Sequence, residues 1–170
     1  MPSMTDEERE EAAWNLVRAY LETATPEQWH IYVARSNYDD NVKGLQWLID
    51  NPKLDRGTAL MIYWYLGAAY YVQFASEDDM ESYQRETFRT LLLIEQRYRD
   101  GFYSRDEIWF DPAHSEGGGP ANYPELPQRR RTPELMLQAS SGREYVDINP
   151  DDYDDGLPME LVDKLYALYD

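Results

Sequence analysis

The chain has no cysteine among its 170 residues, which excludes disulfide bonds, thiolate catalysis and cysteine-based zinc sites. Basic residues are also scarce. The 16 Lys and Arg stand against 33 Asp and Glu, so the formal net charge is −17. This sign disfavours binding to nucleic-acid phosphates, and it attracts cationic proteins or divalent cations. We therefore expect a protein partner, a basic toxin or effector domain, and neither nucleic acid nor a membrane.

A signal peptide and a membrane span are the next features that the sequence lacks. The first residues, MPSMTDEEREE, are acidic and contain no apolar run, so we expect a cytoplasmic protein. Residues 57–76 carry no charged side chain and are long enough to cross a bilayer. They nevertheless contain four tyrosines and Gln73, and no Lys/Arg-rich loop flanks them. The stretch instead predicts a buried central helix over about 57–75, with Asp55 or Thr58 as its cap.

Short-range signals predict the other helices. Thr5 with Glu8 and Thr25 with Gln28 fit capping boxes, which start helices ending near residues 23 and 34. Apolar residues over 42–49 predict a third helix with Asp40 as its cap, and a long amphipathic helix runs from about Met80 to residue 100. The fold class is mainly α, a compact helical bundle or stacked helix pairs around the central helix.

The remainder of the chain has a different composition. Six of the ten prolines and the run of three glycines at 117–119 lie within residues 101–156, which predicts an irregular arm packed on the core. Apolar spacing over 157–170 predicts a closing helix. The predicted division is a helical core at 1–100, the arm at 101–156 and the closing helix, as one domain. The triplet Arg129-Arg130-Arg131 predicts an intramolecular contact with acidic residues.

One stretch resembles a known bacterial family. The element Asp55-Arg56-Gly57-Thr58-Ala59-Leu60, followed by Tyr63-Trp64, is its most specific part, and Trp29-His30 and Asn37-Tyr38-Asp39-Asp40 lie upstream. Over about residues 25–75 the chain resembles the domain of unknown function 4274 family. The resemblance implies a small helical bacterial domain with no established activity, so it assigns no catalytic residue. It marks Asp55, Arg56, Gly57, Thr58 and Trp64 as a structural motif.

Two acidic segments are the candidate partner-binding residues. Carboxylates and aromatic rings occur together there, and such groups serve as charge-complementary contacts and anchors at interfaces. The residues are Tyr38, Asp39, Asp40, Asp151, Asp152, Tyr153, Asp154 and Asp155. The string from Asp147 to Gly156 is similar to a calcium loop, but Pro158 occupies the place of its bidentate glutamate, so we predict an exposed acidic loop and no metal site. No cofactor is expected.

These observations favour an acidic protein-binding module, most concretely an immunity-type protein that neutralises a cationic toxin by direct binding. No nucleophile motif supports an enzyme. The first alternative is an enzyme or small-ligand domain with a site around His30, Asp55 and Arg56, where His30 would be the base. The second alternative is an oligomeric scaffold whose 101–156 arm contacts a neighbouring subunit.

Overall fold

The structure, a computed structural model, describes residues 2–170. Eight α-helices and two short 3-10 helices together contain 51% of the residues, and the only paired strands within 2–170 form a small hairpin, so the mainly α fold class is confirmed. The contacts divide the chain into two units: one joins the residues up to Asp50 with Val146–Asp170, and the other is Asn51–Tyr145. The predicted division at residues 100 and 156 stays a prediction.

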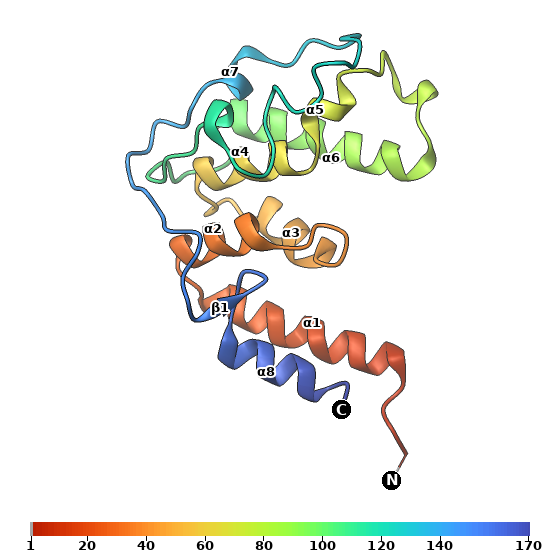
Figure 1. The fold of residues 1–170 in the computed structure, drawn as a ribbon, viewed down its shortest axis with the longest axis vertical. Helices are drawn as coiled ribbons and strands as arrows, with labels where there is room; N and C mark the ends of the chain where they lie inside the picture. Colours follow the sequence, from red (N-terminus) through yellow and green to blue (C-terminus); the bar gives the residue numbers. More distant parts are fainter. Residues whose placement is uncertain (1) are drawn as a thin grey trace. The chain divides into compact units, whose positions relative to one another are not determined.

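The first unit is built from both ends of the chain (Figure 1). It contains α1 (Asp6–Thr23), α2 (Pro26–Arg35), α3 (Val42–Ile49), β1 (Tyr153–Asp154), β2 (Leu157–Pro158) and α8 (Met159–Ala167). Helix α1 contacts both α3 and α8. Both predicted capping boxes are present, at Thr5 and at Thr25, because each needs only residues three positions apart.

Aromatic side chains join α1, α2 and α3 into the core of this unit. Trp29 donates its indole N–H to the carbonyl oxygen of Leu21 at 2.9 Å, which ties α2 to the end of α1. The Trp29 ring meets Trp47 of α3 edge-on, with ring centroids 5.9 Å apart. Such edge-to-face pairs add about 0.5–1.5 kcal/mol beyond the apolar area that they bury. Trp29 thereby packs α2 against both α1 and α3.

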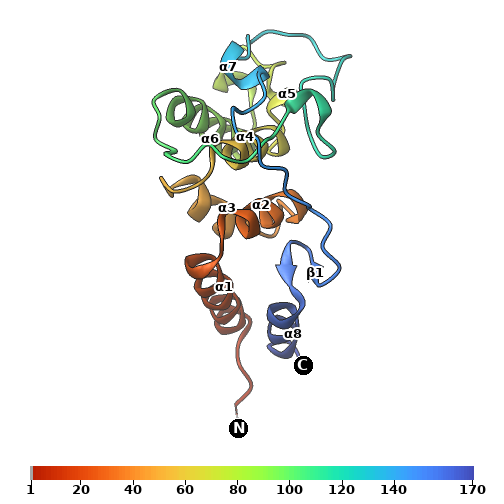
Figure 2. The same cartoon turned by 90° about the vertical axis from the view of Figure 1, so that its left-hand side faces the viewer.

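The second unit contains α4 (Arg56–Tyr65), α5 (Ala68–Tyr71), η1 (Glu77–Asp79), α6 (Ser82–Arg99), η2 (Pro112–His114) and α7 (Glu134–Leu137). Figure 2 shows α6 beside α4, and these two helices make the most extensive contact between elements of this unit. Eight residues of α4 are buried, from Gly57 to Trp64. Helix α4 is therefore buried on nearly every side, as predicted for the central helix.

The predicted helix over 57–75 is interrupted in the structure. Gly67 has φ +95°, in the left-handed region, and it separates α4 from α5. A glycine in this conformation is a common helix terminator, because a side chain there would be strained. The absence of charge over residues 57–76 gives no sign of this break, so the predicted helix extends too far. No helix among residues 2–170 is long and apolar enough to cross a membrane.

Candidate functional site

All eight predicted partner-binding residues belong to the first unit. The carboxylates of Asp39, Asp40, Asp151, Asp152, Asp154 and Asp155 are exposed, whereas the rings of Tyr38 and Tyr153 are half-buried. The acidic groups are thus available to a partner, and the two tyrosines are partly committed to packing within the unit.

The acidic turn between α2 and α3 is fixed by local hydrogen bonds. The side-chain oxygen of Asn37 accepts from the Asp39 N–H at 3.0 Å, and the Asn37 amide donates to Asp40 at 3.0 Å. The Tyr38 hydroxyl donates to the carbonyl oxygen of Val33 at 3.0 Å. The prediction that Asp40 caps α3 is wrong, because Asn41 is the N-cap residue and makes no side-chain cap bond. The carboxylate of Asp40 serves the turn instead.

The second acidic segment folds as a hairpin. Tyr153 pairs with Pro158 and Asp154 with Leu157, and the two residues between have φ +49° at Asp155 and +83° at Gly156. An Asp-Gly pair with both φ positive is typical of the two-residue type I′ hairpin turn. This backbone differs from a calcium loop. Within residues 2–170 no group of three or more His, Asp or Glu side chains is placed to hold a metal ion.

The last turn of α2 connects the two acidic segments. Arg35 donates to the carbonyl oxygen of Ile148 at 3.0 Å, and the turn at Asn37–Asp40 begins two residues later. Farther along α2, the Gln28 amide donates to the Tyr153 hydroxyl at 3.1 Å. Arg35 also lines a hollow of about 380 Å³ whose wall includes Tyr153, Asp154 and Asp155. The acidic hairpin is therefore held against α2.

Charge is distributed very unevenly between the two units. The first unit has 18 acidic and 5 basic residues, a net of −13, whereas the second has 15 and 11, a net of −4. The smaller of the two segments of the first unit, Val146–Asp170, has 8 acids against Lys164 alone. Most of the negative charge of the protein thus lies in the unit that carries the predicted partner-binding residues.

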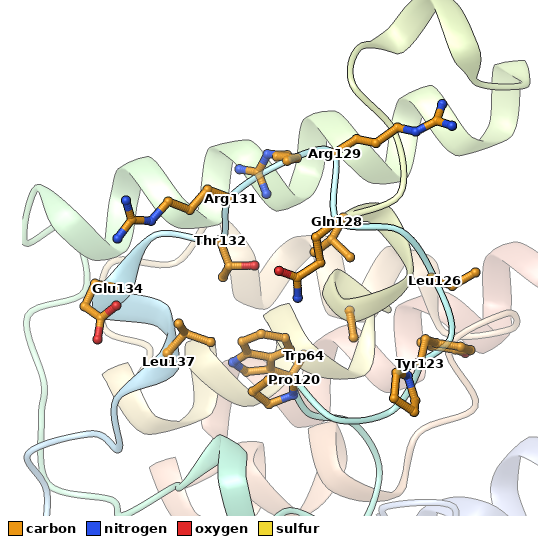
Figure 3. Close-up of a pocket in the computed structure, with 14 residues that line it drawn as sticks. Trp64, Pro120, Tyr123, Leu126, Gln128, Arg129, Arg131, Thr132, Glu134 and Leu137 are labelled. Atoms are coloured by element: carbon orange, nitrogen blue, oxygen red, sulfur yellow. The ribbon is translucent and has the colours of Figure 1, made fainter.

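The second unit contains a pocket of about 620 Å³ (Figure 3). Trp64 and Pro120 form its floor in this view, and the segment from Gln128 to Thr132 crosses above them. Three of the lining residues are the arginines of the triplet 129–131, and Glu134 is the only acidic residue among those that line it. A protein with a large negative charge therefore has a locally basic pocket.

The middle arginine of the triplet is bound inside the unit. Arg130 forms an ion pair with Glu95 of α6, with 2.7 Å between the Arg130 Nη2 and Glu95 Oε2 atoms, and its guanidinium lies over the Phe88 ring. The Tyr63 hydroxyl of α4 donates to the same carboxylate at 2.8 Å. The predicted contact of the triplet with acidic residues is thus a bond to one buried glutamate.

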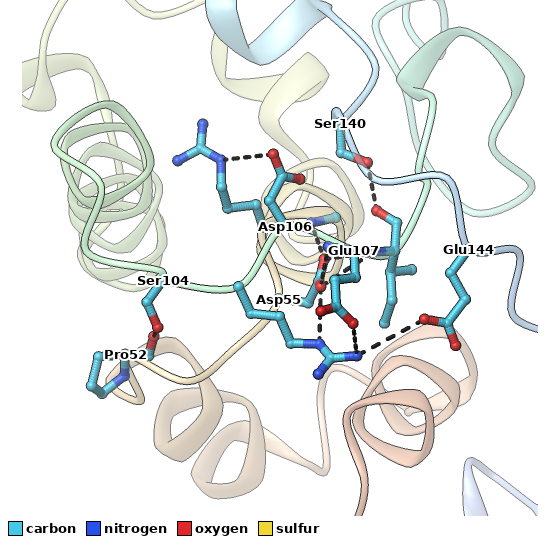
Figure 4. Close-up of polar contacts among 11 residues, drawn as sticks. Pro52, Asp55, Ser104, Asp106, Glu107, Ser140 and Glu144 are labelled. Carbon is cyan, nitrogen blue, oxygen red and sulfur yellow. Dashed lines mark hydrogen bonds and ion pairs between the residues drawn. The ribbon is translucent and has the colours of Figure 1, made fainter.

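Asp55 is the centre of a polar cluster at the start of α4 (Figure 4). Its side chain is fully buried and accepts hydrogen bonds from the backbone N–H groups of Gly57, Glu107 and Ile108, at 2.8–3.2 Å. Arg105 lies 3.3 Å away and also pairs with Glu107 at 2.6 Å. Burial raises the pKa of the Asp55 carboxyl, and the three N–H donors and Arg105 oppose that shift. Asp55 fastens the 105–108 segment to the cap of α4.

The neighbours of Asp55 in the motif have structural contacts of their own. Arg56 lies over the Tyr98 ring at 3.8 Å and donates to the Tyr98 carbonyl oxygen at 2.6 Å. A Cβ atom at Gly57 would come within 2.3 Å of the carbonyl oxygen of Ile108, so only glycine fits between α4 and that strand-like segment. Trp64 donates its indole N–H to the carbonyl oxygen of Met136 at 2.9 Å.

The three residues of the catalytic alternative are divided between the units. His30 belongs to the first unit, and Asp55 and Arg56 belong to the second. The His30 side chain is only 4% exposed, and burial lowers its pKa to about 4. A histidine at this depth is a neutral core residue at pH 7, and it does not line either pocket described above. The catalytic alternative stays a prediction.

The sequence does not predict several of the residues that contact Asp55 or Arg130. Arg105 and Glu107 contact Asp55 from positions 50 or more residues away, and Ser140 donates to the carbonyl oxygen of Ile108. Nothing in the sequence near these residues indicates the contacts. Glu95 did carry a signal, because it lies on the same helical face as Phe88, Leu91 and Tyr98. A carboxylate on an apolar face indicates a buried cationic or hydroxyl partner.

Comparison with known families agrees with the motif. Residues 24–99 match the family described as Domain of unknown function (DUF4274), which extends the resemblance seen over 25–75 to the end of α6. No curated protein and no solved structure matches the chain. The structural roles of Asp55, Gly57 and Trp64 in capping and packing account for the most specific part of the motif. The chain thus carries a DUF4274 domain over residues 24–99, a domain with no known activity.

Proposed function

We propose that this protein is a binding module whose first unit presents an acidic surface to a cationic protein. Its most concrete form is an immunity-type protein that neutralises a cationic toxin in the cytoplasm by direct binding. The observation that carries the proposal is the charge of the first unit, −13 of the total −17, together with six exposed carboxylates on the turn at 39–40 and the hairpin at 151–155.

Electrostatics explains why such a surface suits recognition. Complementary charge accelerates encounter and selects among partners more than it adds to the final affinity. The two segments are held by hydrogen bonds from Asn37, Gln28 and Arg35, so little ordering of the backbone is needed on binding. The proposed action is occlusion by contact, and it requires no catalytic group.

Binding to cationic toxin domains tests the proposal, and any toxin encoded by a neighbouring gene is the first candidate. The measurement is the association rate and Kd by surface plasmon resonance at two salt concentrations. The variant Asp39→Lys/Asp40→Lys should weaken binding by at least about tenfold, which is 1.4 kcal/mol. The association rate of the wild type should fall as salt increases.

The matched control is Glu10→Lys/Glu11→Lys, which makes the same change of net charge on exposed residues of α1. Equal weakening by both variants would show that net charge alone matters, which contradicts a defined surface. Absence of binding to every cationic toxin domain tested would reject the proposal altogether.

A further inference from the structure

The pocket of the second unit is suited to a small ligand by its volume, its lining and its charge. Its volume of about 620 Å³ lies within the range of roughly 300–1,000 Å³ that is usual for small-molecule sites. Eight of its fourteen lining residues are apolar or aromatic, with Trp64, Tyr123 and Leu137 among them, and the other six are polar or charged. Its charged residues are three arginines and one glutamate, although the second unit as a whole is negative.

The wall that carries the arginines is held in place by the core. The backbone N–H groups of Arg129 and Arg130 both donate to the carbonyl oxygen of Val72, at 2.8 and 3.0 Å. The bond of Arg130 to the buried Glu95 fixes the middle of the segment. The two remaining arginines are therefore carried by a backbone that is already ordered, which reduces the entropic cost of using them for binding.

Arg129 and Arg131 are exposed, and neither guanidinium forms an ion pair with any other residue of the 2–170 range. Figure 3 shows their side chains extending outward in opposite directions from the segment above Trp64, while Gln128 and Thr132 point inward above Trp64. Both guanidinium groups therefore face solvent at the rim of the pocket, where an anion can reach them. Glu134 lies on the Arg131 side in this view. No carboxylate lines the pocket beside Arg129, whereas Glu134 lies near Arg131.

We infer that this pocket binds an amphipathic organic anion. The apolar body of the ligand enters above Trp64 and Pro120, where the Gln128 amide and the Thr132 hydroxyl offer hydrogen bonds. Its phosphate or carboxylate stays at the mouth beside Arg129, because guanidinium groups bind both anions through paired N–H donors. An inorganic anion makes only the charged contact with Arg129 and none of the apolar contacts above Trp64, so it binds weakly.

Two pairs of probes show whether the anionic group of the ligand is a phosphate or a carboxylate. Adenosine monophosphate is compared with adenosine, and octanoate with octanamide, by calorimetric titration of the full chain and by shifts of its amide and indole NMR signals. We expect one charged probe to bind at one site with a Kd of about 10 µM to 1 mM. Its neutral counterpart and inorganic phosphate should bind at least about tenfold more weakly.

Variants locate the binding at the pocket. Arg129→Gln should weaken the charged probe by about tenfold, and Arg131→Gln by less, because Glu134 offsets Arg131. The control Arg99→Gln/Arg143→Gln removes two exposed arginines that do not line the pocket and should leave the Kd unchanged. Thermal unfolding verifies that each variant is folded.

Three results would overturn the inference: no saturable binding of either charged probe up to about 1 mM, equal binding of the neutral counterparts, or equal effects of Arg129→Gln and the control. None of them bears on the acidic surface of the first unit. Failure of this inference and failure of the proposed function are therefore separate results.

Discussion

At the scale of single residues, the family motif is explained by close packing and by one buried carboxylate. Asp55 has to serve three backbone N–H groups at once, and Gly57 has to admit the carbonyl oxygen of Ile108 at a distance that excludes a side chain. Loss of a buried acceptor leaves several donors without partners, which costs about 1–3 kcal/mol for each group. The motif is thus a folding determinant of the second unit.

His30 gives the residue-scale prediction. Burial lowers its pKa from 6.5 to about 4, so between these values the unfolded chain binds a proton that the folded chain does not. Stability therefore falls as the pH falls through this window, by about 3 kcal/mol from this group. Urea unfolding of the wild type and of His30→Gln from pH 4 to pH 7 measures this pH dependence of stability.

Carboxylates also titrate in this pH range, but they are the same in both proteins. The difference in the free energy of unfolding between the wild type and His30→Gln therefore reports on the histidine alone. The variant should be less stable at pH 7 and should lose less stability on acidification. Parallel curves for the two proteins would show that His30 is protonated without cost in the folded state.

At the scale of elements, the sequence predicts best what neighbouring residues decide. The capping boxes at Thr5 and Thr25 follow from side chains within one turn, and they are confirmed. The break between α4 and α5 at Gly67 is not predicted, because an uncharged stretch gives no sign of a left-handed residue within it. The partners of Asp55 were missed because they approach from residues 105–108, far along the chain.

The ion pair between α6 and the arginine segment gives the prediction at this scale. Glu95 and Arg130 have side chains that are 8% and 18% exposed, so removing one partner leaves a buried charge. Arg130→Leu should destabilise the protein by about 3 kcal/mol, because a broken buried pair costs about 3–5 kcal/mol. The double variant Glu95→Leu/Arg130→Leu should recover a large part of that loss.

A double-mutant cycle by urea unfolding measures the coupling. The exposed pair Arg89–Glu77, with 2.7 Å between Nε and Oε1, is the control, and its coupling should be too small to resolve. Additive effects of the Glu95 and Arg130 substitutions would mean that the pair contributes nothing beyond its separate side chains.

At the scale of the whole molecule, the uneven charge has an energetic consequence of its own. A net charge of −13 in the first unit repels itself, and salt screens this repulsion over about 10 Å at 0.1 M. Added NaCl should slow amide hydrogen exchange in α1 and α8 by up to about tenfold, which is 1.4 kcal/mol.

Helix α6 serves as the internal control, because the second unit has a net charge of only −4. Its amides should respond much less to the same change of salt. An equal response in both units would point to a general salt effect on the protein and against repulsion within the first unit.

The division of the first unit between the two ends of the chain has a consequence during synthesis. The second unit, Asn51–Tyr145, is continuous and can fold as soon as its last residues leave the ribosome. The first unit cannot be completed until β1, β2 and α8 have been translated. During translation α1 therefore lacks its α8 neighbour until the last residues of the unit are made. Premature termination before Val146 would release a protein without the acidic hairpin.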